Sequence, residues 1–149
     1  MSVDRSFVSD NDTERARLRA LVARLSDTDL ARALPAGWTV AAVLGHLAFW
    51  DQRILVLLDA WQQHGIAPSP LHEADTDWIN DAGKPFLLAM PPRQLAGLAV
   101  TIAEAVDRRV AALPDDLITR NAAAGTPLSL RRSEHRREHL DEIESALRR

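Results

Sequence analysis

The sequence predicts an all-α protein, a four-helix bundle with a short extra helix between its second and third main helices. Apolar residues recur at helical spacing along most of the 149-residue chain, whereas the alternation that is typical of strands is nearly absent. Proline and glycine separate four long amphipathic segments, and such helices bury their apolar faces against one another. One domain of residues 1–149 accounts for this length.

The first long helix is expected over residues 12–24. Asn11 followed by Glu14 resembles a capping box, in which two side chains satisfy free backbone N–H groups at the start of a helix. Ser26 and Asp29 repeat the pattern before the short segment DLARAL. The sequence therefore predicts a first element that is broken in the middle.

The second main helix is expected over residues 40–64. Thr39 is a suitable N-cap, because its hydroxyl can accept a hydrogen bond from the first turn, and Gly65 can end the helix. A shorter helical piece, DTDWINDAGKPFLLA, occupies residues 75–89 after a proline-rich loop. This piece is the extra helix of the predicted bundle.

The third and fourth main helices complete the predicted bundle. The Pro91–Pro92 pair suits the first turn of a helix that reaches about Leu113, where the next residue is again proline. Residues 115–127 are expected to form a connection. Ser129 can then cap a final helix over residues 130–149.

The composition restricts the function classes. A formal net charge of −3 gives no electrostatic reason to expect binding to nucleic acid or to a membrane surface. No uninterrupted apolar run is longer than that of residues 54–58, which is far shorter than a membrane span, and no signal segment is visible, so we expect a cytoplasmic protein. The chain contains no cysteine. Any metal ion must therefore be bound by histidine or carboxylate side chains.

Two histidines lie four residues apart in the charged segment SEHRREHLDEI near the end of the chain. With about 100° of rotation per residue, His139 lies about 40° from His135 around the final helix, and Ile143 lies at about 80°. Both histidines therefore lie on the stripe that is expected to face the core. Imidazoles at positions i and i+4 of one helix can bind the same transition metal ion.

His46 is the candidate for a third ligand. On the second main helix it lies at the edge of the apolar face that includes Trp50. Three imidazoles from two facing helices leave open positions for water or substrate, an arrangement suited to Zn²⁺, Ni²⁺ or Fe²⁺. A structural or solvated role for the histidines is the alternative, because a single HxxxH pattern is common. His64 and His72 are expected at the surface.

Two segments, GWTVAAVLGHLAFWDQRI and SEHRREHLDEI, resemble the second-helix and final-helix signatures of the DinB-like four-helix metalloprotein superfamily. The resemblance implies up-down-down-up connectivity and a metal site formed by His46, His135 and His139. It also implies a divalent metal ion, often zinc or nickel, and a homodimer. Members include thiol-dependent transferases and the mycothiol-dependent maleylpyruvate isomerase, in which the metal ion activates a low-molecular-weight thiol such as mycothiol; bacillithiol is a second candidate.

The expected function is that of a metal-dependent enzyme that activates a low-molecular-weight thiol, or water, for transfer to a small electrophilic substrate. Trp50 and Arg132 would line the pocket, where Arg132 could meet a substrate carboxylate. The alternatives are core packing for Trp50 and a solvated position at the helix end for Arg132. Asn80, on the short extra helix, is expected to have a turn-like or capping role, and a position at the mouth of the pocket is the alternative. Two alternatives stay open: an inverted zinc protease with Glu138 as general base, since HRREH matches H-x-x-E-H, and a non-catalytic metal- or ligand-binding stress-response bundle that acts as a dimer.

Overall fold

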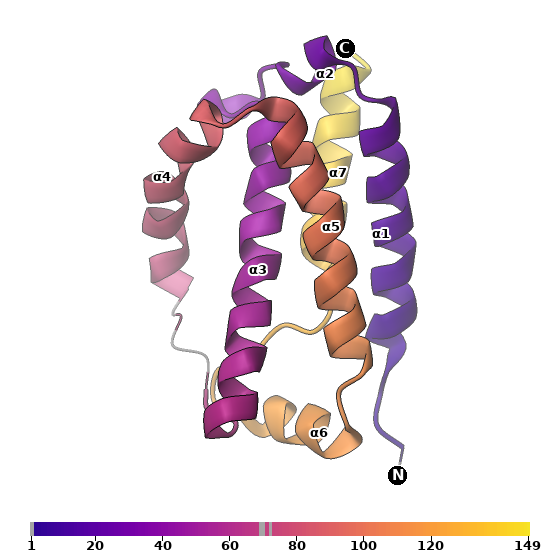
Figure 1. Cartoon of the computed structure of the whole chain (residues 1–149), viewed down its shortest axis with the longest axis vertical. Helices are drawn as coiled ribbons and strands as arrows, with labels where there is room; N and C mark the ends of the chain where they lie inside the picture. The colour runs from indigo at the N-terminus through magenta and orange to yellow at the C-terminus, as the bar shows by residue number, and fades with distance from the viewer. Residues whose placement is uncertain (1, 69–70, 72) are drawn as a thin grey trace.

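The computed structural model describes residues 2–68, 71 and 73–149, and no strand is present in this part of the chain (Figure 1). The prediction of an all-α fold is confirmed. The α-helices are α1 (Ser6–Arg24), α2 (Asp27–Leu30), α3 (Val40–His64), α4 (Glu73–Ala89), α5 (Pro92–Ala111), α6 (Asp115–Ala123) and α7 (Ser133–Leu147). A single 3₁₀ turn, Pro35–Gly37, precedes α3.

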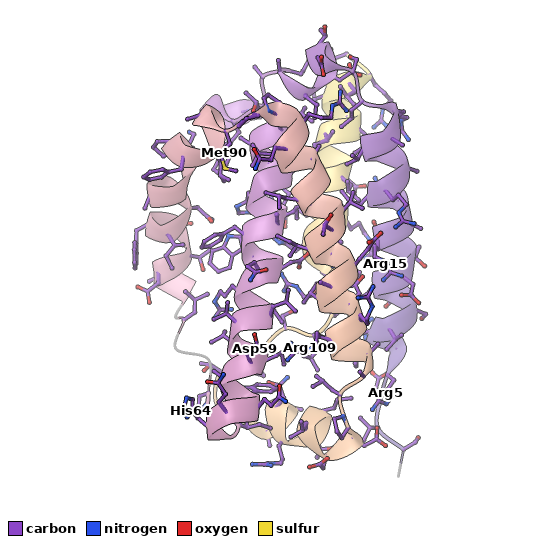
Figure 2. The ribbon with its side chains drawn as sticks, in the orientation of Figure 1. Arg5, Arg15, Asp59, His64, Met90 and Arg109 are labelled. Atoms are coloured by element: carbon purple, nitrogen blue, oxygen red, sulfur yellow. The ribbon has the colours of Figure 1, made fainter. Side chains whose placement is uncertain are left out.

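Helices α1, α3, α5 and α7 pack along one another, α4 covers the outer side of α3, and α6 crosses one end (Figure 1). Ion pairs tie the exposed edges together: Arg109 binds Asp59 at 2.7 Å between α5 and α3, and Arg5 binds Asp115 at 2.7 Å at the end where α6 lies (Figure 2). Helix α4, between α3 and α5, is the extra helix that the sequence predicts between the second and third main helices.

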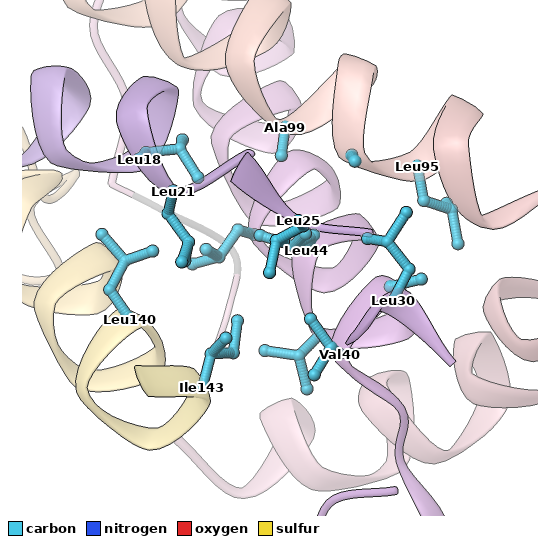
Figure 3. Close-up of a cluster of buried hydrophobic side chains, with 14 of the residues drawn as sticks. Leu18, Leu21, Leu25, Leu30, Val40, Leu44, Leu95, Ala99, Leu140 and Ile143 are labelled. Carbon is cyan, nitrogen blue, oxygen red and sulfur yellow. The ribbon is translucent and has the colours of Figure 1, made fainter. Parts of the chain in front are cut away.

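The core consists of two apolar clusters. One, near the end of the molecule that carries α2, contains leucines of α1, α3, α5 and α7 together with Ile143 (Figure 3). The other, toward α6, includes Phe7, Ile54 and Val106. Between the clusters each of the four helices carries buried polar side chains instead of apolar ones: Asn11, Glu14, His46, Asp51, Asp107, Arg132, Ser133 and Arg136. This polar layer is the part of the interior where chemistry can be sought.

The predicted start of the first helix is wrong. Helix α1 begins at Ser6, so Asn11 and Glu14 lie inside it and do not form a capping box. The Asn11 amide instead donates to the carbonyl of Leu130 at 2.9 Å and accepts from the backbone N–H of Ser133 at 2.9 Å. Because these partners are more than a hundred residues away, the local pattern could not reveal them.

The other predicted ends are confirmed in part. Ser26 and Asp29 form the capping box of α2, Thr39 accepts a hydrogen bond from the third residue of α3, and Gly65 ends α3 with a φ of 85°. The expected connection over residues 115–127, however, contains α6. Its signal was present, since Pro114 stands at the N-cap and two aspartates occupy the first turn.

The final helix is shorter than expected. Helix α7 begins at Ser133, with Arg132 at its N-cap, and Ser129 lies in the preceding connection. That connection is held by the buried Asn121 side chain, which bonds both backbone groups of Leu128 at 2.8 and 2.9 Å. Both backbone groups of Leu128 are therefore satisfied without a helix at this residue.

Helix α3 is long and apolar enough to cross a membrane by length and composition alone, a property that the uninterrupted run of residues 54–58 does not reveal. Its most apolar window is 67% buried inside the molecule, as expected for a core helix. His64 at its last position is exposed, as predicted, and His72 lies outside the described residues.

Candidate metal centre

The three predicted histidines meet inside the molecule. His46 projects from α3, and His135 and His139 project from successive turns of α7. One ring nitrogen from each lies within 4.8 Å of the other two, and Nε2 of His46 is 3.0 Å from Nε2 of His135. Nitrogen atoms that share a tetrahedral zinc ion at about 2.0–2.1 Å lie about 3.3–3.4 Å apart, so shifts of about 1 Å suffice for a common cation.

The site is shielded from water on the α3 side. His46 is only 9% exposed, and the rings of Trp38 and Trp50 stand edge-on to it with centroids at 5.7 and 6.4 Å. His135 and His139 are half-buried. The triad therefore lies at the inner wall of an accessible cavity.

The environment keeps two of the imidazoles neutral. Burial, and then the proximity of His139, lowers the pKa of His46 from 6.5 to about 4. Burial, followed by the neighbouring histidines and the cationic Arg132 and Arg136, lowers the pKa of His135 to about 2. Neutral imidazole is the form that binds a metal ion, since protonation would occupy the lone pair.

One nitrogen in the triad has no protein partner. Nδ1 of His139 is buried without a hydrogen bond to any described residue, and the nearest carboxylate oxygen, on Glu142, is 3.6 Å away. A buried polar atom without a hydrogen-bond partner costs free energy. When one ring nitrogen of a histidine binds a metal ion, only the other ring nitrogen still needs a hydrogen-bond partner from the protein. Three converging imidazoles, two of them held neutral, fit a divalent transition metal ion.

The lowered pKa of His46 predicts how the metal-free protein responds to acid. Between pH 6.5 and about 4 the unfolded chain binds a proton at His46 that the folded chain excludes, so stability is full above pH 6.5 and falls as the pH decreases. We expect a loss of about 2–3 kcal/mol from this group between pH 7.5 and pH 4.5. Urea unfolding of chelator-treated protein measures it. His46→Gln should flatten the pH dependence by that amount; an unchanged slope would refute the assignment.

The triad opens into a cavity of about 820 Å³, which we call the histidine cavity. The predicted residues Trp50 and Arg132 both line it, as does Asn80. Asn80 lies within α4 as expected, but a turn-like or capping role is wrong: its Oδ1 accepts a hydrogen bond of 2.8 Å from Nε1 of Trp50, and the alternative, a position at the pocket, is confirmed. Glu138, from the protease pattern, also lines the cavity and is exposed.

Arg132 is buried, not solvated. Its Nε donates to Oδ1 of Asp51 at 2.8 Å. The other oxygen of Asp51 accepts from Arg136 at 3.1 Å, and Arg136 also makes two bonds of 2.7 Å to the carboxylate of Asp107. Arg15 of α1 adds a further cation at 2.7 Å from Asp107. This chain of ion pairs joins α1, α3, α5 and α7 directly beneath the triad, and the sequence pattern did not predict it.

A family model, described as the mycothiol maleylpyruvate isomerase N-terminal domain, matches residues 12–144. The chain belongs to this family. The family is part of the DinB-like superfamily, so the predicted resemblance is confirmed. Comparison with curated proteins and with solved structures gives no match. The three histidines that converge in this family member lie within the matched region.

Proposed function

We propose that this family member is a metal-dependent enzyme that activates a low-molecular-weight thiol, or water, for transfer to a small electrophilic substrate. The observation that carries the proposal is the meeting of His46, His135 and His139 at the wall of the histidine cavity. Membership of a family named for a mycothiol-dependent isomerase supports a thiol in particular. Zinc or nickel, and mycothiol or bacillithiol, are the proposed partners of the site.

The residues around the triad have distinct proposed roles. The histidines would hold the ion, which when bound lowers the pKa of a thiol or water and so supplies a nucleophile near neutral pH. Trp38 and Trp50 exclude water from one side of His46.

The cations of the cavity suit an anionic substrate. Arg53 and Arg132 both line the histidine cavity, and burial, together with the nearby Arg132, lowers the pKa of Arg53. Either arginine could meet an anionic group such as a thiolate or a substrate carboxylate, and four carboxylates of the same lining, Asp77, Asp81, Glu138 and Glu142, would limit how much anionic charge the cavity accepts. Asp51 holds Arg132 in place through its Nε.

Several finer features belong to the same proposal. An up-down-down-up order of α1, α3, α5 and α7 is supported by the path of the chain in Figure 1. A homodimer, a cytoplasmic location and the absence of nucleic-acid and membrane partners stay predictions.

Metal analysis and a thiol assay test the proposal together. We expect protein purified without a histidine tag to contain about one divalent metal ion per chain, as one three-histidine site requires. It should consume mycothiol or bacillithiol in the presence of 1-chloro-2,4-dinitrobenzene, and lose this activity after chelation. No turnover with mycothiol, bacillithiol or glutathione would refute an enzyme that activates a thiol, and metal without turnover would favour a binding protein.

A further inference from the structure

A second cavity lies between α3 and α4 and meets the first. This α3–α4 cleft has a volume of about 400 Å³. Three residues, Trp38, His46 and Asn80, line both the cleft and the histidine cavity. The two spaces therefore share a boundary at one of the proposed metal ligands.

The cleft and the histidine cavity differ sharply in polarity. Away from the shared boundary the cleft is walled by apolar side chains and two small residues, with Phe49 from α3 and Trp78, Ile79, Phe86 and Leu87 from α4. The histidine cavity is lined by arginines and by acidic residues of α4 and α7 as well as by apolar side chains such as Val43 and Trp50. A molecule that occupied both spaces would need a polar end at the triad and an apolar body in the cleft.

The aromatic wall of the cleft is open to solvent. Phe49 is 49% exposed, Trp78 is 59% exposed and Phe86 is 75% exposed. Exposed aromatic side chains that gather around a concave site are a common feature of ligand pockets, because the ligand supplies the missing apolar contact. Their position beside His46 points to a ligand of the same site.

Gly83 lies in the wall of the cleft. It lines the cleft within α4, and a Cβ atom added there would meet no other atom within 4 Å. Glycine inside a helix costs about 0.5–1 kcal/mol relative to alanine. No neighbouring atom lies close enough to Gly83 to require a glycine there. A larger side chain at this position would therefore occupy space in the cleft.

We propose that the α3–α4 cleft binds the apolar body, an aromatic ring system or a branched alkyl group, of the small molecule whose polar end reaches the histidine triad. This inference rests on the proposed function and adds a substrate class to it: an amphipathic electrophile or thiol with an apolar group next to its reacting end. The shared boundary at His46 favours this occupant over a second copy of the chain.

The first experiment uses 2-naphthol and metal-free protein, and so does not depend on the metal. Calorimetry should show one binding site per chain. Gly83→Leu should weaken binding at least about tenfold by filling the cleft. Gly97→Leu is the matched control and should bind as the parent does, since Gly97 is an exposed glycine of α5 where an added Cβ would also meet no atom within 4 Å. Phe86→Ala, which removes an exposed side chain, should also weaken binding if the cleft is the site.

The second experiment asks whether the cleft serves the triad. In Co²⁺-loaded protein, the visible spectrum should show tighter binding of 2-naphthylmethanethiol than of ethanethiol, and Gly83→Leu should abolish this preference without changing the affinity for Co²⁺. Failure to bind Co²⁺ would reject the metal proposal. The proposal that the cleft binds an apolar group would then be decided by the 2-naphthol experiment alone. Absent 2-naphthol binding, or equal binding by the parent and Gly83→Leu, would overturn the inference. The inference would also be overturned if Gly83→Leu changed the oligomeric state in ultracentrifugation and left the binding of 2-naphthol unchanged.

Discussion

Replacing His46, His135 or His139 by alanine is expected to weaken the binding of Zn²⁺ or Co²⁺ by more than about 100-fold. Loss of a residue that only supports a ligand already costs about 10–100-fold, and each of these changes removes a ligand itself. Two imidazoles from one helix, or one from each of two helices, would remain. Equilibrium dialysis with chelator-buffered metal measures the affinity of each variant.

Thermal unfolding gives an independent readout of the same site. A ligand at about 100 times its Kd stabilises the folded state by about 2.7 kcal/mol, so metal should raise the melting temperature of the parent protein and not that of the three variants. His64→Ala is the matched control, because His64 is exposed at the end of α3 and should leave both readouts unchanged. Stoichiometric tight binding by any of the three variants would show that the triad is not the metal centre.

The triad could be predicted because its geometry is nearly local. Four residues separate His135 from His139, so the helical repeat alone places both rings on one face. His46 needed one further step, the assumption that the apolar edge of its helix faces the last helix, and the structure confirms it. The three rings converge because these two helices face each other, which the helical repeat allowed but did not by itself require.

The polar layer beneath the triad could not be predicted in this way. Arg136 lies in the charged segment SEHRREHLDEI, whose local pattern does not distinguish it from the neighbouring arginine, yet its side chain is fully buried. Its partners Asp51 and Asp107 come from two other helices, and only their occurrence within apolar helical faces indicated burial. Pairings over such separations depend on the rotation of each helix, which a single sequence does not determine.

The α3–α4 cleft could not be predicted for a related reason. Helix α4 was predicted as an element, but its placement over α3 depends on contacts such as the Trp50–Asn80 hydrogen bond and the position of Lys84 above the Trp38 ring at 5.4 Å. The sequence around Gly83 shows an amphipathic helix interrupted by glycine and proline. The sequence does not show that the aromatic side chains of α4 would border a cleft next to His46 of α3.

Arg136→Met is expected to lower the free energy of unfolding by about 3–5 kcal/mol, the range for removal of one partner from a buried ion pair. Methionine can fill much of the volume, but Asp107 would lose two bonds of 2.7 Å and keep the ion pair with Arg15 alone, and Asp51 would lose its bond of 3.1 Å and keep Arg132. Both carboxylates are buried. Urea unfolding of metal-free protein at pH 7.5 measures the loss.

The neighbouring arginine provides the control that separates burial from charge. Arg137 is about half exposed and lies 3.3 Å from Glu14, so Arg137→Met should cost less than about 1 kcal/mol although it also deletes one arginine from α7. Arg136→Lys should fall between the two, because it keeps the charge and loses the planar pair of donors that matches Asp107. If Arg136→Met and Arg137→Met were equally stable, the layer beneath the triad would not hold the four helices together, and the position of His135 next to Arg136 would have to depend on apolar packing alone.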